Sequence, residues 1–279
     1  MRRPLIIMLC CFLAGALIFT LGTVEPSGTS AKQPAQTYLL LLDNDTGAFL
    51  MQLRKGMEEA AQALGARLDV MVMLPGDALP ELKGYTNLLL YMQEPEALVD
   101  RLRALGVSSP ITISEGEDAL VSPDFLQGDR LLCACAAKAA KGGQIALVLP
   151  KGEGGEALLE KRLEAITQAL SGTHYRVTDT PDAGDAVLLA LSPDLISHLA
   201  KAWPDKPLYG YAPGEEARIS LLESGQVEAL AAVNPYAMGY SALLTAAAPR
   251  PEKLDIPFKL IDLTSMYLPE NVKIVFPLL

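Results

Sequence analysis

The sequence predicts an α/β protein of two Rossmann-like, doubly wound parallel-sheet lobes, preceded by an N-terminal membrane or signal helix. Short apolar runs alternate with amphipathic stretches after residue 37, and Gly or Pro residues separate them, as in parallel sheets covered by helices. About ten strands are expected, which suits two sheets better than one very wide sheet. Arg2 and Arg3 precede an uncharged apolar run, Leu5–Leu21, which predicts the N-terminal helix.

Apolar spacing predicts each element after the N-terminal region. The run YLLLL has the length and content of a buried strand, and in the stretch that follows it apolar residues recur every three or four positions, as on one helical face. Strands are expected at 38–42, 68–73, 87–91, 111–113, 145–149, 175–178, 186–191, 208–211 and 229–233. Helices are expected at 49–64, 96–105, 124–141, 156–170, 194–202, 215–224 and 236–247. Two further apolar stretches lie at 257–261 and 272–276.

The connection between Met73 and Asn87 is short for a lobe of this kind. Only LPGDALPELKGYT intervenes, and it contains two prolines. We therefore expect a turn or a short helix there instead of a full crossover helix. Such a connection would leave one face of the sheet exposed as a possible docking surface for a partner.

The N-terminal region is expected to direct the chain across the cytoplasmic membrane. Residues 1–22 are interpreted as a signal peptide or an uncleaved membrane anchor, since a positive start before an apolar run is typical of both. Lipidation is a third alternative, although Leu9 before Cys10 is not the small residue that it needs. Residues 23–36 are rich in Pro, Ser, Thr and Gly and are interpreted as a flexible tether. Each alternative places the remaining chain outside the cytoplasm, either anchored or secreted.

Composition excludes several classes of function. The chain has 279 residues, 50% of them hydrophobic and 20% charged, which is incompatible with a disordered protein. It carries 23 Lys and Arg against 33 Asp and Glu, a formal charge of −10. Nucleic-acid binding is not expected, because neutralising phosphates needs a basic face.

No catalytic or metal-binding pattern is found. His174 and His198 lie on different predicted elements without a Ser or Asp partner, and there is no nucleophile elbow or P-loop. Cys133 and Cys135 point to nearly opposite sides of one helix, so they cannot bridge each other, and at least one is expected to be a small buried apolar residue. We expect no enzyme activity, no cofactor and no metal.

Four segments resemble the sugar-type (type 1) periplasmic binding proteins, which are related to ribose- and galactose-binding proteins and to the ligand-binding domains of LacI-type repressors. DNDTGAFLMQLRKGMEEAAQALGARLDV (43–70) is similar to the first strand, loop and helix of that family. SPDFLQGDRLL (122–132) and RLEAITQAL (162–170) resemble its second-lobe motifs. GYAPGEEARISLLESGQVEALAAVNPYAMGYSAL (210–243) keeps the family's Gly, Pro and Met spacing and is the most specific match.

The resemblance covers about residues 38–276 and implies two lobes, joined by three crossings, that close over a ligand. Lobe one is expected at 37–117 plus 236–255, and lobe two at 118–235 plus 256–279. The related repressors carry an N-terminal helix-turn-helix where this chain has its apolar run, which excludes a DNA-binding repressor.

Ligand contacts are expected beyond the carboxyl ends of the strands, where open parallel sheets bind ligands. Many of the polar residues there could instead cap helices. The candidate ligand-binding residues are Asp43, Asn44, Phe49, Tyr91, Ser114, Glu115, Arg162, Ser192, Tyr211 and Asn234.

The resemblance also shows where this chain departs from the usual sugar clamp. It implies that Phe49 keeps the first aromatic position and Arg162 the clamp arginine, with Ser114 and Glu115 at an Asp-Arg or Asp-Ser pair. Other positions have changed: Gly47 stands for Asn, Leu50 for the second aromatic residue, Ser192-Pro193 for Asn-Asp, Ala212 for Asp and Val233 for Gln. Because lost hydrogen-bonding partners forfeit specificity, an aldose pocket of the usual type is not expected.

Individual candidates have structural alternatives. Phe49 could be a core residue, and Arg162 could cover apolar surface with its stem while its head reaches water. Tyr91 could replace the lost second aromatic residue or pack in the core. If Glu115 and Glu117 faced the cleft, a cationic ligand such as an amine would become possible.

Two functions follow from the resemblance. The first is an extracytoplasmic solute-binding protein that delivers a sugar-like or other polar metabolite to an ABC permease. The alternative is a membrane-tethered sensory or accessory protein that signals to a histidine kinase or another membrane partner. A monomer is expected in both cases, and a degenerate protein that no longer closes is a third, weaker alternative.

Overall fold

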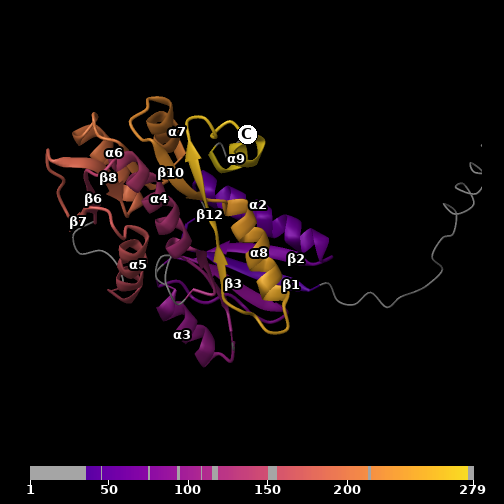
Figure 1. Ribbon diagram of the computed structural model, residues 1–279. Coiled ribbons are helices and arrows are strands. Elements are labelled where there is room, and N and C mark those ends of the chain that lie inside the picture. Colours follow the sequence, from indigo (N-terminus) through magenta and orange to yellow (C-terminus); the bar gives the residue numbers. More distant parts are fainter. Residues whose placement is uncertain are drawn as a thin grey trace, which may run out of the picture. The chain divides into compact units, whose positions relative to one another are not determined.

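Two sheets of mostly parallel strands organise the chain (Figure 1). The computed structural model describes residues 36–275 apart from 45, 75, 93–94, 108, 115–118, 150–155 and 213–214. The first sheet has the order β11-β5-β4-β3-β1-β2 and the second the order β12-β10-β9-β8-β6-β7. Among the described strands, only β12 pairs antiparallel with its neighbour. The predicted fold class of two doubly wound lobes is therefore confirmed for the described residues.

The first sheet has helices on both faces. Its strands are β1 (Thr37–Leu42), β2 (Arg67–Val72), β3 (Asn87–Tyr91), β4 (Ile111–Ile113), β5 (Val121–Pro123) and β11 (Leu254–Ile256), and its helices are α2 (Ala48–Ala63), α3 (Glu96–Ala104) and α8 (Pro235–Ala247). Alternate residues of β1 point to opposite sides: Leu40 packs towards α2 and α8, whereas Leu39 and Leu41 pack towards α3. This is why the whole run YLLLL is apolar, because a central parallel strand is buried on both faces.

The second sheet is built in the same way. Its strands are β6 (Gln144–Val148), β7 (Tyr175–Thr178), β8 (Asp185–Ala190), β9 (Leu208–Tyr211), β10 (Ala229–Val233) and β12 (Phe258–Asp262), and its helices are α4 (Phe125–Ala140), α5 (Glu156–Ala169), α6 (Pro193–Ala202), α7 (Glu215–Glu223) and α9 (Pro269–Val275). Ile145 and Leu147 of β6 pack towards α4 and α5. Ala146 and Val148 pack on the other face with residues of α6, α7 and α9.

Three segments of chain cross from one sheet to the other, at 123–125, 233–235 and 256–258. The first and third crossings are hydrogen-bonded together. The Asp124 amide donates to the Ile256 carbonyl at 2.8 Å, the Gln127 side-chain amide donates to the Phe258 carbonyl at 3.2 Å, and the Phe258 amide donates back to Gln127 Oε1 at 2.9 Å. These bonds fix the register of two crossings against each other.

The first crossing lies later in the chain than the sequence indicated. β5 pairs with β4 and β11 and so belongs to the first sheet, although residues 118–123 were expected in lobe two. β5 and β11 have three residues each, too few for a periodic signal. The other two crossings lie within two residues of the expected positions.

The short connection after β2 contains no helix among its described residues, as expected. The prediction that it exposes a sheet face is wrong for β1 and β3, because Leu79, Leu82 and Tyr85 of this connection pack against the same core cluster as α3. Among the described strand residues of this face, the one large apolar side chain that remains open is Met71 of the edge strand β2, at 38% exposure. The connection itself therefore covers this face of β1 and β3.

Cys133 of α4 is buried, as expected for at least one of the two cysteines, and Cys135 is half-buried. Burial, with a smaller contribution from Asp129, raises the pKa of Cys133 to about 12. The thiol therefore stays protonated and unreactive at neutral pH.

No helix in the described part of the chain is long and apolar enough to cross a membrane. The predicted signal or anchor and nearly all of the predicted tether lie outside the described residues.

Candidate ligand-binding site

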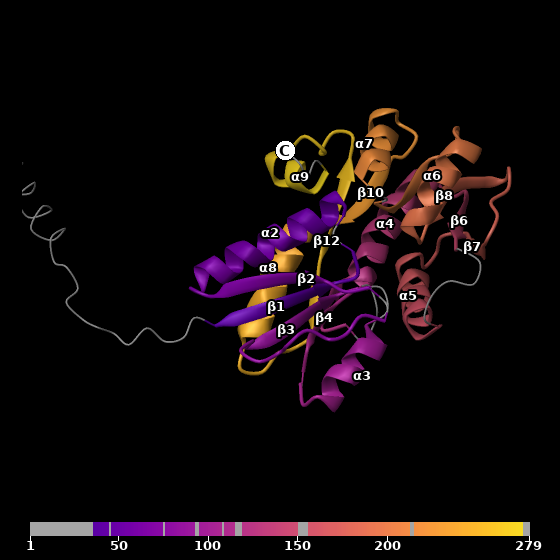
Figure 2. The same ribbon diagram turned by 180° about the vertical axis from the view of Figure 1, so that it is seen from behind.

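The carboxyl ends of the strands bring most of the predicted site residues to the same edge of each sheet. In the first lobe, Asp43 and Asn44 follow β1, Tyr91 ends β3 and Ser114 follows β4. In the second lobe, Ser192 follows β8, Tyr211 ends β9 and Asn234 follows β10. Glu115 lies outside the described residues. Figure 2 shows β1 and β3 of the first sheet and β6 and β8 of the second.

Phe49 and Tyr91 form a stacked aromatic pair in the first lobe. Their ring centroids are 6.0 Å apart and their planes differ by 21°, within the range of favourable aromatic packing. Both rings are half-buried, and both pack against the core cluster between the sheet and α2. The pair therefore has a core side and an accessible side. Tyr91 stands beside Phe49, where the sequence suggested that it could replace the aromatic residue lost at Leu50.

Asp43 and Asn44 form a local polar turn after β1. The Asn44 side-chain amide donates to Asp43 Oδ1 at 2.7 Å, and Asn44 is exposed while Asp43 is half-buried. Ser114 is half-buried, and its amide donates to the Val121 carbonyl at 3.3 Å, which ties the loop after β4 to β5. These residues place polar side chains after β1 and β4, the two strands that flank β3 and its last residue, Tyr91.

Arg162 of α5 is held by a carboxylate that the sequence reading did not identify. Its Nε and Nη2 donate to the two oxygens of Asp129, each at 2.9 Å, and Nη2 also donates to the Leu191 carbonyl at 3.1 Å. The Asp129 side chain is completely buried and that of Arg162 is 11% exposed. The alternative in which the Arg162 head lies unpaired in open water is therefore wrong, because Asp129 of α4 is a buried partner for two of its nitrogens.

A cluster of three aromatic rings lies beside this ion pair. Phe125, Tyr211 and Phe258 contact one another with centroid separations of 4.9 to 5.3 Å, and the Arg162 guanidinium carbon lies 4.8 Å from the Phe125 ring centre and 5.1 Å from that of Tyr211. Gly128 is required here, because a Cβ at that position would lie 2.9 Å from both Phe258 and the Tyr211 hydroxyl. The first and third crossings supply two of these rings.

The Tyr211 hydroxyl is hydrogen-bonded to the ion pair and does not face solvent. It is 1% exposed, and its hydroxyl donates to Asp129 Oδ1 at 2.6 Å. Burial and the nearby Asp129 charge raise the pKa of Tyr211 well above its usual value, so the hydroxyl keeps its proton. For Arg162, burial acts to lower the pKa, but the hydrogen bonds to Asp129 outweigh it, and the pKa is raised overall. Both groups keep fixed protonation states at neutral pH.

Ser192 and Asn234 begin helices, which is the structural alternative that the sequence left open. The Asn234 side chain accepts a hydrogen bond from the Ala237 amide at 3.2 Å and caps α8. Ser192 occupies the cap position of α6, but its side chain makes no capping bond. Of these two side chains, only that of Ser192 makes no capping bond and so remains available to a ligand.

Three residues of this site were missed from the sequence: Asp129, Phe125 and Phe258. A signal for Asp129 was present, since it lies four residues after Phe125 and three before Leu132 on the apolar face of a predicted helix. An acidic residue on such a face needs a partner. The partner Arg162 is 33 positions away, so spacing along the chain could not reveal it.

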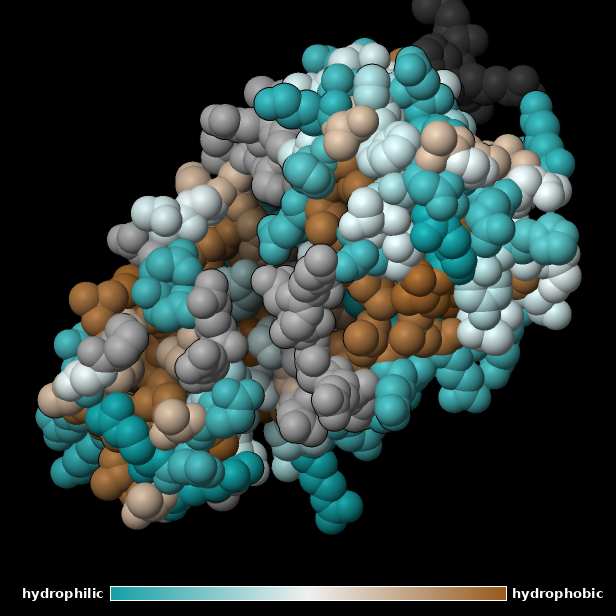
Figure 3. Space-filling view, turned by 90° about the vertical axis from the view of Figure 1, so that its left-hand side faces the viewer, coloured by the Kyte–Doolittle hydropathy of each residue, from teal (hydrophilic) through white to brown (hydrophobic). Residues whose placement is uncertain are grey.

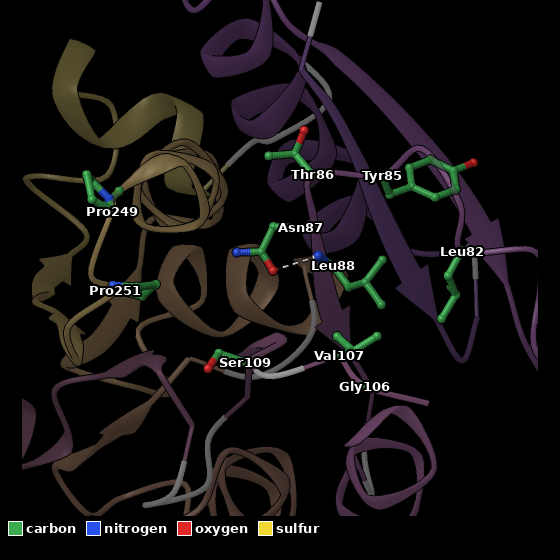
Figure 4. Close-up of a pocket in the computed structure, with 11 residues that line it drawn as sticks. Leu82, Tyr85, Thr86, Asn87, Leu88, Gly106, Val107, Ser109, Pro249 and Pro251 are labelled. Atoms are coloured by element: carbon green, nitrogen blue, oxygen red, sulfur yellow. Dashed lines mark hydrogen bonds between the residues drawn. The ribbon is translucent and has the colours of Figure 1, made fainter. Parts of the chain in front are cut away.

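A cavity of about 430 Å³ lies at the opposite, amino end of the first sheet (Figure 4). It is lined by the start of β3, the segment before β4 and the segment after α8. Asn87 at its centre is already satisfied, since Oδ1 accepts from the Leu88 amide and Nδ2 donates to the Ala246 carbonyl. None of the predicted site residues lines it. Among the described residues no cluster of His, Cys, Asp and Glu could hold a metal ion.

Comparison with solved structures identifies the fold. A solute-binding protein of an ABC transporter from Agrobacterium vitis, bound with alpha-D-tagatopyranose, shares 16% identity over 86% of this chain and 99% of its own, with a TM-score of 0.63. The fold is that of the type 1 periplasmic binding proteins. GanP, a glucose-galactose binding protein from Geobacillus stearothermophilus, gives the same TM-score at 16% identity over 85% and 100% of the two chains. A chain of a mutant XylFII–LytSN complex gives 0.61 at 15% identity over 82% and 98%.

No protein-family profile and no curated protein matches this sequence. The resemblance noted in the sequence motifs therefore agrees with the fold, while the residues at the site must be judged on their own geometry.

Proposed function

We propose that this chain is an extracytoplasmic solute-binding protein, without enzyme activity, that captures a small polar molecule of sugar-like chemistry between its two lobes for an ABC importer. The observation that carries the proposal is the pair of unlike half-sites at the carboxyl edges of the two sheets. One presents the Phe49–Tyr91 stack, and the other presents Arg162 on an aromatic support. An apolar ring face and a hydrogen-bond donor are what a hydroxyl-rich ring needs.

On the face that Figure 3 draws, hydrophobic residues, in brown, lie among hydrophilic ones. A sugar has apolar C–H faces and polar edges, so a site for it combines both kinds of side chain. The solved neighbours that bind sugars support this choice of ligand class.

The test is a thermal-shift screen of the protein against aldoses, ketoses, nucleosides, amines and autoinducer-like compounds, followed by calorimetric titration of the hits. A ligand at about 100 times its dissociation constant adds roughly 2.7 kcal/mol to the free energy of unfolding. The proposal predicts such a gain for at least one uncharged polyhydroxylated compound. No gain with any compound would contradict it.

The alternative is a membrane-tethered sensory or accessory protein that signals to a histidine kinase or another membrane partner. The altered clamp positions, such as Ala212 and Val233, favour it, as does a solved neighbour seen in complex with a second protein, LytSN. Neighbouring genes separate the two functions: permease and ATPase genes indicate transport, whereas kinase and regulator genes indicate sensing.

A further inference from the structure

Both oxygens of the Asp129 carboxylate are engaged by the second half-site, in three hydrogen bonds. Oδ2 accepts from Arg162 Nε at 2.9 Å, and Oδ1 accepts from Arg162 Nη2 at 2.9 Å and from the Tyr211 hydroxyl at 2.6 Å. The residue is 0% exposed and sits in the second turn of α4 among apolar neighbours. A buried carboxylate destabilises the folded protein unless it is paired, and Arg162 is the cation that pairs with Asp129.

The guanidinium of Arg162 is oriented by these contacts. Nε and Nη2 face Asp129, and Nη2 also bonds the carbonyl of Leu191, directly after β8 at the carboxyl edge of the sheet. The Phe125 and Tyr211 rings lie within about 5 Å of the guanidinium carbon. The described part of the chain supplies no acceptor for Nη1, and 11% of the side chain remains exposed. Nη1 makes none of these bonds and is not buried without a partner, so it is the nitrogen that a ligand can reach.

The charge of this donor is already compensated before any ligand arrives. A carboxylate or phosphate that approached Nη1 would also feel the negative charge of Asp129, on the far side of the same guanidinium, in a poorly solvated environment. A neutral hydroxyl or carbonyl oxygen would accept the same hydrogen bond without that repulsion.

We propose that Asp129 is a specificity-determining residue, which turns Arg162 into a neutralised donor for uncharged ligands and excludes anionic ones. This proposal rests on the proposed function, since it places the ligand against Arg162. It follows that Asp129→Asn, which removes the negative charge but keeps the shape, creates an anion site at Arg162.

The experiment uses inorganic phosphate as the probe and the full chain in a mild non-ionic detergent. Thermal melting and calorimetric titration compare phosphate with chloride at equal ionic strength. For Asp129→Asn we expect saturating phosphate to raise the melting temperature by about 5–10 °C, and for the wild type no change. The double variant Asp129→Asn/Arg162→Gln should lose the phosphate effect.

Asp185→Asn is the matched control. Asp185 is also a buried carboxylate that holds an arginine, Arg176, by two hydrogen bonds, but Arg176 retains Asp182 at 3.0 Å when Asp185 is neutralised. Phosphate should therefore give Asp185→Asn no stabilisation.

The proposal is overturned if phosphate leaves Asp129→Asn unchanged, if it stabilises the double variant or Asp185→Asn equally, or if the wild type binds it as tightly. If Asp129→Asn does not fold in chloride, it is refolded in phosphate: recovery in phosphate alone supports the proposal, and no recovery overturns it. Failure of the proposed function would be seen separately. The wild type would then bind no sugar, whatever effect phosphate has on Asp129→Asn.

Discussion

Arg162 and Arg176 each hold a buried carboxylate by two hydrogen bonds, but the two pairs lie at opposite edges of the second sheet. Asp129 and Arg162 lie at the carboxyl edge, whereas Asp185 opens β8 at the amino edge and is held by Arg176 of β7. The first pair stands where ligands bind in folds of this type, and the second stands where they do not. Position on the sheet, more than chemistry, distinguishes a candidate binding arginine from a structural one.

Asp185 gives the protein a predictable response to acid. Burial acts to raise the pKa of Asp185, but hydrogen bonds from Arg176 and from the Asp182 amide outweigh it and lower the pKa below 3.8. A carboxyl group whose pKa is lowered in the folded state stabilises the protein above its unfolded pKa, and this stabilisation is lost as the pH falls through the folded pKa. Urea unfolding between about pH 5 and pH 2 should therefore show a shallower loss of stability in Asp185→Asn than in the wild type. Parallel pH profiles would contradict this assignment.

Phe49 should matter for binding and little for folding, because its ring is half-buried and only one side packs on the core. Phe49→Ala is expected to weaken binding of the cognate ligand by about two orders of magnitude, with a nearly unchanged melting temperature of the free protein. Calorimetric titration and thermal melting measure the two effects.

Tyr240→Ala is the control for this variant. Tyr240 stacks on Tyr236 at 6.2 Å, in an open groove between α2 and α8. Its removal should leave the affinity as in the wild type. Equal affinities for wild type and Phe49→Ala would exclude the aromatic pair from the site.

At the scale of elements, α2 and α8 are the most intimately packed helices of the first lobe, and they lie side by side in Figures 1 and 2. Two glycines make this possible. A Cβ on Gly239 would lie 1.9 Å from the Leu53 carbonyl oxygen, and a Cβ on Gly56 would lie 2.1 Å from that of Tyr236. Since the obstructing atoms are backbone, the helices would have to separate to admit even a methyl group.

Gly239→Ala should therefore destabilise the protein by about 1–3 kcal/mol or more, despite the higher helix propensity of Ala. Leu244→Ala on the same helix, at a side chain that is 40% exposed, should cost far less. Chemical denaturation of both variants measures the difference. A Gly239→Ala protein as stable as the wild type would show that the two helices are not in such close contact.

The elements themselves were largely predictable because most have a periodic apolar pattern long enough to read. The strand YLLLL and the helix from Ala48 to Ala63 were identified within one or two residues. The strands β5 and β11 were not, because three residues carry no period and their pairing is decided by the crossings.

The site was less predictable than the fold. Residues at strand ends could be located from the sequence, but Asp129 and Phe125 contact Arg162 from α4, far along the chain. The sequence therefore indicated Arg162 without its partner, and Tyr211 without its buried hydroxyl. Tertiary contacts, which local patterns do not encode, determine what each of these side chains can offer a ligand.

At the scale of the whole molecule, the chain crosses between the sheets three times, and the Gln127–Phe258 bonds couple the first crossing to the third. Such an arrangement allows the lobes to move about a short, tied hinge. Phe125 and Phe258, each at the lobe-two end of its crossing, also contact each other with ring centroids 5.3 Å apart, and Phe125 contacts Arg162. Binding at Arg162 would therefore be felt directly at the crossings.

The proposed location of the protein makes a separate prediction. A reporter fused after residue 36 should be active only outside the cytoplasm, since Arg2, Arg3 and the apolar run Leu5–Leu21 are expected to direct export. N-terminal sequencing of the protein from cells should find either an intact start or a start between residues 23 and 32. Activity of the reporter in the cytoplasm would refute export.

The central claim is that one small molecule is held by both lobes at once, and hydrogen exchange in the presence and absence of a bound sugar tests it most directly. The account predicts slower exchange on binding in two regions together: the start of α2 around Phe49 in lobe one, and the start of α4 with the middle of α5 around Arg162 in lobe two. The cavity around Asn87 and the outer face around Tyr240 should exchange as before. Protection confined to one lobe, or centred on Asn87, would contradict the claim.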